Sequence, residues 1–236
     1  MISLLPLEEG GAQQWMGVRA KRWTPRFLPD LHRNPLPRKG TPKVAEGRGC
    51  KKGTEPLHVS DIRIETERLL LRPVAAEDFA SWAAFFADPV ATRHLGGPRG
   101  EALAWRHFLS MAGAWRIQGF GAFSVLDKAT GGWLGWTGPW HPVAWPGTEV
   151  GWCFARAAWG QGFATEAAAA AIDWVFRRLD WFEVIHLVPP DNQASQRIAQ
   201  RLGSTVQRRI VMAEPFDREP VDVWSQSREA WERHRA

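Results

Sequence analysis

Two glycines that bracket one polar residue, directly before an alanine-rich segment, constrain the fold of this chain more than any other feature. The stretch "AWGQGFATEA" covers residues 158–167 and follows a short apolar run. It therefore predicts a strand, a tight turn and a helix in succession. Glycine at positions 160 and 162 permits backbone conformations, and a close approach to the backbone, that a side chain would prevent.

The ligand expected at this turn is an anion. The first N–H groups of a helix have no intrahelical partner, and the helix dipole adds partial positive charge, so phosphate is the usual occupant. A nucleoside-triphosphate loop would need a Lys-Ser/Thr pair where Phe163 and Ala164 stand, and a dinucleotide fingerprint would need a third glycine at Thr165. The turn taken alone leaves a second interpretation open, a glycine-rich turn that serves only packing.

The rest of the chain predicts a mixed α/β (α+β) fold, with a mostly antiparallel sheet flanked by helices. Helical spacing of Phe79, Trp82, Phe85 and Phe86 indicates one core-facing helix. A second helix is expected to bury the face formed by Trp105, Phe108, Leu109, Ala112 and Trp115. The expected strands are 68–74, 121–127, 132–138, 148–155, 183–188, 204–212 and 221–227, and the expected helices are 75–88, 101–118, 165–178 and 192–202, followed by a polar tail, 228–236.

The basic character of the chain belongs to its N-terminal segment. The 236 residues carry a formal net charge of +5, but residues 1–60 hold 11 Lys and Arg against 5 Asp and Glu, whereas the remainder holds 19 against 20. Residues 1–60 also contain seven Pro and seven Gly without a sustained period, which predicts a disordered basic extension followed by one domain over residues 61–230. The nearly neutral charge of the domain does not support a nucleic-acid-binding groove in it. The basic extension as an arm that contacts RNA stays an open alternative.

Cysteine content and hydropathy predict a cytoplasmic protein. Cys50 and Cys153 are the only cysteines, so they form neither a disulfide framework nor a zinc quartet, and no metal is expected. The sequence contains no run of 18 apolar residues, so no membrane span is predicted. The opening "MISLLPLEEGG" lacks the basic and apolar regions of a secretory signal.

Several segments in the same order resemble the GCN5-related N-acetyltransferase (GNAT) superfamily, in particular its RimJ/RimL-like branch of ribosomal-protein N-terminal acetyltransferases. The segments are "IETERLLLRPVAAEDF" (64–79), "TEVGWCFARAAWGQGFATEAAAAAIDWVF" (148–176) and "VIHLVPPDNQASQRIAQRLGS" (184–204). The diphosphate motif of the family, Arg/Gln-x-x-Gly-x-Gly/Ala, maps onto residues 159–164, with Trp159 in place of Arg or Gln. The resemblance implies a GNAT fold, acetyl-CoA as co-substrate and acetyl transfer to an amine.

The resemblance also implies where coenzyme A binds. Its pantetheine arm is expected along the strand 148–155, with an N–H near Phe154 stabilising the oxyanion, and Asn192 is expected to hydrogen-bond the arm. The implied cofactor-binding residues are Cys153, Phe154, Ala155, Trp159, Gly160, Gln161, Gly162, Phe163, Ala164, Thr165, Asn192 and Ser195.

Two residues are predicted to move protons. Glu149 is the best-placed carboxylate to deprotonate the amine, although a solvated strand-end glutamate with water as base is the alternative. Many family members return a proton to the thiolate with a tyrosine, but this chain contains none. Ser195 is the predicted replacement; it could instead cap its helix, or the thiolate could leave unaided, since a thiol pKa near 8.5 allows it.

The acceptor side is expected to include Gly96, Gly97, Trp140 and His141, with Trp145 beside them. The acceptor is either a protein or peptide N-terminus or a small-molecule amine. A non-catalytic acyl-CoA-binding sensor is the alternative from another class, supported only by the missing tyrosine. The resemblance further implies a possible homodimer through the closing strands, 204–227.

Overall fold

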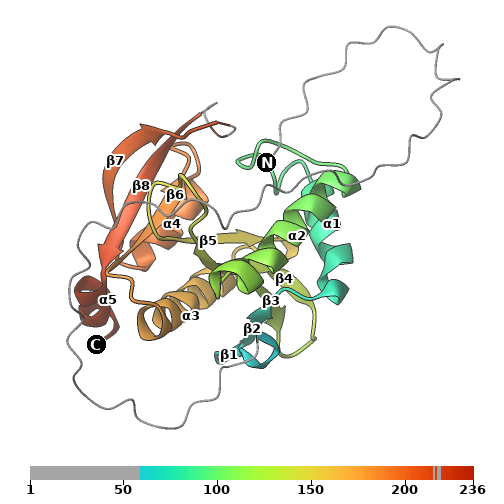
Figure 1. Ribbon diagram of the computed structural model, residues 1–236, viewed down its shortest axis with the longest axis horizontal. Helices are drawn as coiled ribbons and strands as arrows, with labels where there is room; N and C mark the ends of the chain where they lie inside the picture. The colour runs from blue at the N-terminus through green and yellow to red at the C-terminus, as the bar shows by residue number, and fades with distance from the viewer. Residues whose placement is uncertain (1–58, 215, 217–218) are drawn as a thin grey trace, which may run out of the picture. The chain divides into compact units, whose positions relative to one another are not determined.

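Eight strands form one sheet in the part of the chain that this computed structural model describes, residues 59–214, 216 and 219–236 (Figure 1). The order across the sheet is β1-β2-β3-β4-β5-β6-β8-β7, and all neighbours are antiparallel except β5 and β6. The predicted mixed, mostly antiparallel sheet is confirmed. The strands are β1 (Ile64–Glu65), β2 (Leu69–Pro73), β3 (Phe123–Asp127), β4 (Trp133–Trp140), β5 (Glu149–Phe154), β6 (Glu183–Val188), β7 (Thr205–Val211) and β8 (Pro220–Ser227).

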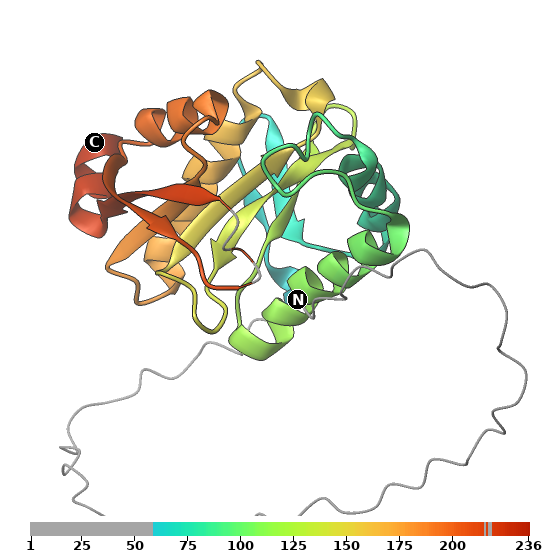
Figure 2. The same ribbon diagram turned by 90° about the horizontal axis from the view of Figure 1, so that it is seen from above.

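Helices cover both faces of the sheet (Figure 1, Figure 2). They are α1 (Phe79–Ala87), α2 (Glu101–Gln118), α3 (Phe163–Arg178), α4 (Gln193–Arg201) and α5 (Arg228–Arg235), with the short 3-10 helices η1 (Val59–Asp61), η2 (Ala76–Asp78) and η3 (Arg156–Ala158). In these residues no helix is both long enough and apolar enough to cross a membrane. The predicted extension, with Cys50, lies outside the described residues except for positions 59 and 60.

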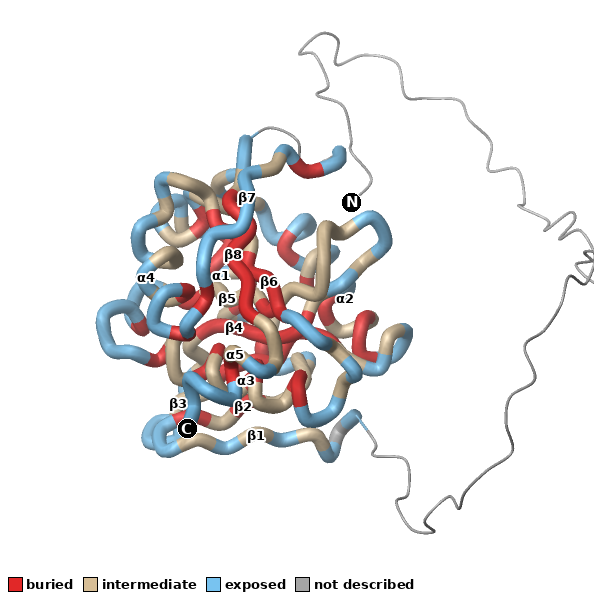
Figure 3. The backbone as a smooth tube through the Cα atoms, turned by 90° about the vertical axis from the view of Figure 1, so that its left-hand side faces the viewer, coloured by how far each residue is buried: buried red, intermediate tan, exposed pale blue. Residues whose placement is uncertain are grey.

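Two apolar layers hold the helices to the sheet. α1 and α2 pack through Trp82, Phe86 and Phe108 onto Trp136 of β4. On the other face, α3 packs through residues such as Ile172 against β5 and β6, and α4 and α5 join the same layer. Buried residues are therefore most frequent along β4, β6 and β8 (Figure 3).

The stripe predicted for α1 is confirmed, because Trp82, Phe85 and Phe86 are buried. The Trp82 ring stacks on Trp136, with ring centroids 4.2 Å apart. The face predicted for α2 is partly wrong, since Trp105 and Leu109 are 42% and 48% exposed. The buried stripe consists instead of Ala104, Phe108, Met111, Ala114 and Trp115. The small alanine side chains in this stripe let the helix approach the sheet. Trp105 instead lies at the surface and packs edge-on against Phe79, with ring centroids 4.7 Å apart.

The segment predicted as a polar tail is also wrong, because residues 228–235 form α5. Its sequence shows no apolar stripe, since Trp231 is its one large apolar residue. That indole is buried against α3 and donates to Asp173 Oδ1 at 2.8 Å, while Ser227 caps the helix by accepting from Ala230 N–H. The helix continues past residue 230, where the predicted domain ends.

The parallel pair β5 and β6 separates almost as soon as it forms. The recorded register between these strands has one pair, Glu149 opposite Ile185, and Ile185 N–H donates to the Thr148 carbonyl at 2.9 Å. Thr148 Oγ1 donates to the Glu183 carbonyl at 2.6 Å and fixes the point of contact. No further residue pair joins the two strands beyond this point, and we call this break in the pairing of the sheet the notch.

A buried ion pair joins β2, η2 and β3. The Arg72 guanidinium forms two 2.8 Å hydrogen bonds with Asp78, whose side chain is 3% exposed. The same carboxylate accepts from Ser124 Oγ at 2.6 Å and from Ala75 N–H at 2.9 Å. Its hydrogen bonds are therefore satisfied on every side, which offsets the cost of burying the charge.

We expect Asp78→Ala to lower the free energy of unfolding by about 3–5 kcal/mol, because it removes the buried carboxylate and leaves the Arg72 guanidinium with only the exposed Glu77 carboxylate and the Pro73 carbonyl as partners. Glu77→Ala is the matched control: Glu77 lies 3.2 Å from the same guanidinium but is 71% exposed, so its loss should cost less than about 1 kcal/mol. Urea denaturation of both variants measures the difference. Equal losses would contradict this assignment.

Candidate functional site

The glycine turn leads into α3 as predicted. Gly160 and Gly162 have φ angles of 75° and 81°, which favour glycine, and Gly162 is the N-cap of α3. No side chain caps this helix, and a Cβ added to Gly160 would meet no atom within 4 Å. The N–H groups of Phe163, Ala164 and Thr165 therefore open the helix without a capping side chain, which fits a diphosphate.

Arg68, for which the sequence indicated no role, holds the turn in place. Its Nη1 donates to the Gln161 carbonyl at 3.0 Å, and its Cζ lies 4.5 Å from the centroid of the Phe163 ring. Its Nε and Nη2 lie 2.7 and 2.6 Å from Glu166 Oε2, in the first turn of α3. The turn is thus attached to the β1–β2 hairpin by a charged side chain.

Glu166 completes this attachment. Its Oε1 accepts from Thr66 Oγ1 at 2.5 Å and from Arg68 N–H at 3.1 Å. Burial raises the pKa of Glu166, but these hydrogen bonds and the Arg68 charge more than offset it and leave the pKa below its ordinary value. In the sequence, the only indication of this attachment was the segment "TERL" (66–69). It belongs to a segment that resembles the GNAT family, but the resemblance implied no role for its arginine.

The predicted pantetheine strand directs its backbone groups to two sides. Ala155 N–H donates to the Leu134 carbonyl at 2.9 Å, so it is engaged within the sheet on the β4 side. Backbone groups alternate in direction along a strand, so those of Cys153 also face β4. Of the three strand residues predicted to contact pantetheine, Phe154 therefore has its backbone groups toward the notch.

Side chains occupy part of the notch side of β5. The Val150 carbonyl accepts from His186 Nδ1 at 2.7 Å, and burial lowers the His186 pKa to about 4, so the ring is neutral. This histidine is a packed residue of β6. Farther along β5, the register pairs neither Trp152 nor Phe154 with a residue of β6. The Phe154 carbonyl accepts instead from Trp159 Nε1 at 2.8 Å.

Glu149 lies where the strands separate. Trp145 Nε1 donates to its Oε2 at 2.6 Å, and the Leu187 N–H of β6 donates to the same carboxylate. Its Oε1 lies 3.3 Å from the position of a Cβ added to Gly151, so the side chain extends along β5 over the face that it shares with Gly151. Burial raises the pKa of Glu149 to about 7, against the two hydrogen bonds, which lower it. A carboxylate with this pKa can accept a proton near neutral pH.

Asn192 and Ser195 meet at the start of α4. Asn192 is the N-cap, and its Oδ1 accepts from Ser195 N–H at 3.2 Å. Ser195 Oγ accepts from the Trp152 indole at 3.4 Å, which brings it to β5 beside the notch. The Asn192 amide N–H groups and the Ser195 hydroxyl proton are not used in these contacts.

The predicted acceptor residues divide into two groups. Trp140 pairs directly with Glu149 across β4 and β5, and Gly96 and Gly97 lie in the α1–α2 loop with φ angles of 85° and 83°. The register thus places Trp140 beside Glu149 in the sheet. His141 is exposed. Its ring centroid lies 6.4 Å from that of Trp181, so its ring contacts Trp181 and not the Glu149 carboxylate.

Cys153 lies on the face of β5 that α1 and α2 cover, and its thiol stays protonated. It packs into the layer beneath α1 and α2. Burial and the Glu149 charge raise the pKa of its thiol, and the Arg99 charge only partly opposes them. A protonated thiol is a poor nucleophile, which favours direct transfer over an acyl-enzyme.

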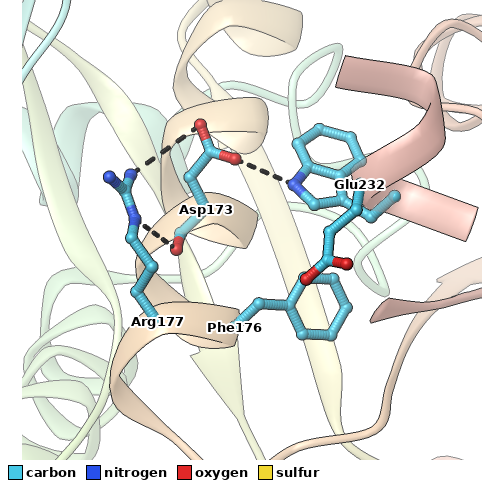
Figure 4. A pocket seen from close by; sticks show the side chains of 5 residues that line it. Asp173, Phe176, Arg177 and Glu232 are labelled. Atoms are coloured by element: carbon cyan, nitrogen blue, oxygen red, sulfur yellow. Dashed lines mark hydrogen bonds and ion pairs between the residues drawn. The ribbon is translucent and has the colours of Figure 1, made fainter. Parts of the chain in front are cut away.

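A hollow elsewhere in the molecule does not belong to this site. It lies between the C-terminal half of α3 and α5 and is lined by Asp173, Phe176, Arg177, Trp231 and Glu232 (Figure 4). Asp173 is already paired with the Trp231 indole and with Arg235, at 2.8 and 3.1 Å. In the described part of the chain, no group of three or more His, Cys, Asp or Glu side chains is arranged to hold a metal ion.

An uncapped glycine turn and a carboxylate of raised pKa are features that an acyl-CoA-dependent transferase would need. Comparison with known proteins identifies the family: residues 68–205 match the Acetyltransferase (GNAT) domain, so the chain belongs to the GNAT acetyltransferases. It is therefore an enzyme of the class that transfers acetyl groups from acetyl-CoA, in place of the alternative non-catalytic sensor.

Individual proteins that are similar to this chain support its assignment to the acetyltransferases. The uncharacterized protein YkkB of Bacillus subtilis is 30% identical over 148 residues, which cover 60% of this chain and 84% of that protein. The uncharacterized N-acetyltransferase p20 of Bacillus licheniformis is 28% identical over 142 residues, 58% of this chain and 79% of that protein. A crystal structure of an acetyltransferase from Agrobacterium tumefaciens has 33% identity and a TM-score of 0.63, covering 75% of this chain and all of that one.

We expect Arg68→Met to raise the KM for acetyl-CoA about tenfold, because the turn loses a charge-assisted attachment of about 1.4 kcal/mol. Acetyl-pantetheine has no diphosphate, so its kcat/KM should not change. Lys128→Met is the control, since Lys128, which follows β3, pairs with Glu65 of the β1–β2 hairpin at 3.0 Å but has no recorded contact with the glycine turn. Thiol-release kinetics with both donors measure the effect, and an equal loss with both donors would contradict it.

Proposed function

We propose that this chain acetylates a primary amine by direct transfer, with Glu149 as the base. The observation that carries the proposal is the position of the half-buried Glu149 carboxylate, which accepts from the Trp145 indole at the last pair of β5 with β6. Burial raises its pKa to about 7. An alkylammonium has a pKa near 10 and must lose a proton before it attacks. Glu149 is hydrogen-bonded to Trp145 and β6, so its position is determined before a substrate arrives.

The residues of the turn would bind the diphosphate of acetyl-CoA. Gly160, Gly162 and the first N–H groups of α3 provide donors, and Trp159 and Gln161 shape the turn through their contacts with Phe154 and Ala157. Bound acetyl-CoA supplies the activated acetyl group. The Phe154 N–H, on the notch side of β5, would stabilise negative charge on the acetyl oxygen, and the unused amide donors of Asn192 would hold the pantetheine.

The proton transfers follow from the two polar side chains at the notch. Glu149 takes one proton from the ammonium, the neutral amine nitrogen forms a bond to the acetyl carbon, and the carbon–sulfur bond breaks. The second proton that leaves this nitrogen ends on the thiolate: Ser195 would give its Oγ–H hydrogen to the sulfur and regain one from the nitrogen through water, since its recorded contacts leave this hydrogen free. No tyrosine exists in the chain to do this.

We further propose the RimJ/RimL-like branch, with a peptide N-terminus or a small-molecule amine as acceptor. Support for the branch comes from "IETERLLLRPVAAEDF", whose Thr66 and Arg68 hold the turn, and from the Asn-x-x-Ser element at α4. A cytoplasmic location is proposed on cysteine usage alone.

We expect kcat/KM for the amine to rise about tenfold per pH unit below pH 7 and to level above it, because Glu149 must be deprotonated to accept the proton. Glu149→Gln should lower kcat by about 10²–10⁴-fold and remove this inflection. Glu183→Gln, at the exposed start of β6, is the control and should change neither. Thiol-release rates between pH 5.5 and 9 test the assignment; a Glu149→Gln profile that keeps its inflection near 7 would contradict it.

A further inference from the structure

Two aromatic rings lie in succession beside the Glu149 carboxylate. Trp145 Nε1 donates to Glu149 Oε2 at 2.6 Å, and the Phe216 ring meets the Trp145 ring edge-on, with ring centroids 5.4 Å apart. Trp145 belongs to the β4–β5 loop, whereas Phe216 belongs to the β7–β8 loop. Two loops that are far apart in the sequence therefore meet next to this carboxylate.

The β4–β5 loop holds Trp145 in a defined place. Ala144 has a φ angle of 65°, a left-handed conformation that is uncommon for a residue other than glycine. Trp145 N–H donates to the Pro142 carbonyl at 3.2 Å, and a Cβ added to Gly147 would lie 3.0 Å from Ile185 Cδ1 of β6. Unfavourable backbone conformations of this kind concentrate at functional sites, and this one directs the indole to the carboxylate.

Phe216 is held by a turn of its own. Its N–H donates to the Ala213 carbonyl at 2.9 Å, and the residue is 41% exposed. A single exposed phenylalanine is ordinary on a protein surface. This ring, however, packs against the side chain that binds Glu149, so it borders the space in front of the base.

No charged side chain is recorded at this wall of two rings. No ion pair of the described residues includes Glu149, and no charge is among the recorded influences on its pKa. Cys153 on β5 and His186 on β6 are neutral at neutral pH, because burial raises the pKa of the thiol and lowers that of the imidazole to about 4. Glu183 lies at the exposed start of β6.

The distances bring both rings within reach of a small acceptor. An amine that gives its proton to Glu149 must lie about 3 Å from a carboxylate oxygen. The indole nitrogen is itself 2.6 Å from this carboxylate, so the first carbons beyond the amine meet the Trp145 ring. A larger group on those carbons extends to Phe216, which packs on the same indole.

We propose that Trp145 and Phe216 form an apolar wall of the acceptor site, and that the acceptor carries an aromatic or branched aliphatic group beside its reactive amine. Such a group loses its contact with water against the two rings, and an aromatic group also packs edge-on or offset against them. A small alkylamine and the first side chain of a peptide offer the same chemistry. This inference rests on the proposed function, with Glu149 receiving the proton.

The test is a thiol-release screen of the full chain with acceptors in two matched series. The first compares 2-phenylethylamine and 3-methylbutylamine with ethylamine and ethanolamine. The second compares peptides that begin with Phe or Leu with the same peptides that begin with Gly or Ser. We expect at least about tenfold higher kcat/KM for the apolar members of the preferred series, and the series that shows it identifies the source of the apolar group.

Phe216→Ala should lower this preference by about fivefold or more, and Phe216→Leu should keep part of it, since leucine retains an apolar side chain. Trp105→Ala is the matched control, because Trp105 is 42% exposed but packs on Phe79 and Phe108 at α1 and α2. It should leave the preference unchanged. The preference is a ratio of two kcat/KM values, so it does not depend on the fraction of a variant that is folded.

Trp145→Phe keeps a ring in the wall but removes the indole N–H. It should preserve most of the preference and move the inflection of the pH profile of kcat/KM above 7, because the indole hydrogen bond lowers the pKa of Glu149. A change in packing alone would not move this inflection.

Three results would each overturn the inference: kcat/KM values for the apolar members that do not exceed those of their small or hydroxylated counterparts, a preference that survives Phe216→Ala intact, or an inflection that stays near 7 in Trp145→Phe. Absence of acetyl-CoA binding by calorimetry would instead overturn the proposed function.

Discussion

The early separation of β5 from β6 is the constraint on which the site depends. A parallel pair normally continues its backbone ladder along both strands, but here it is recorded at Glu149 and Ile185 alone, and side chains replace it. His186 donates to the Val150 carbonyl, and the Glu149 carboxylate accepts from Leu187 N–H. These two contacts satisfy buried backbone groups that would otherwise be costly. They also place a carboxylate of raised pKa at the base of the notch.

The two ends of the notch have opposite electrostatic requirements, and different elements meet them. At the α3 end, an uncapped helix start and two glycines suit an anion, while Arg68 and Glu166 attach the turn to the β1–β2 hairpin. At the other end, Glu149 must accept a proton from an amine, so it needs a low-polarity position close to Trp145 and Trp140. The sheet holds both ends rigidly because α1–α2 and α3–α5 cover its opposite faces.

Local patterns were sufficient to predict most of the fold, but not the contacts that tune the site. Strands such as 183–188 and the helix 101–118 follow from short apolar runs, glycine and proline punctuation and helical spacing. The buried side of α2 was misassigned because two stripes one residue apart fit the same period, and α5 was missed because Trp231 alone anchors it. Arg68 could not be selected, since its role arises from partners far along the chain, which spacing does not reveal.

The central claim is that the glycine turn binds the diphosphate of coenzyme A, and calorimetry of CoA binding to Gly160→Glu tests it most directly. Gly131→Glu is the matched control: both glycines have φ near 70–75° and open space around an added Cβ, so both variants carry a similar folding cost. The account predicts that Gly160→Glu weakens CoA binding by at least about 100-fold, roughly 2.7 kcal/mol, while Gly131→Glu leaves it within about threefold of the unaltered protein. Unchanged CoA affinity in Gly160→Glu would contradict the claim and leave the turn as a packing device.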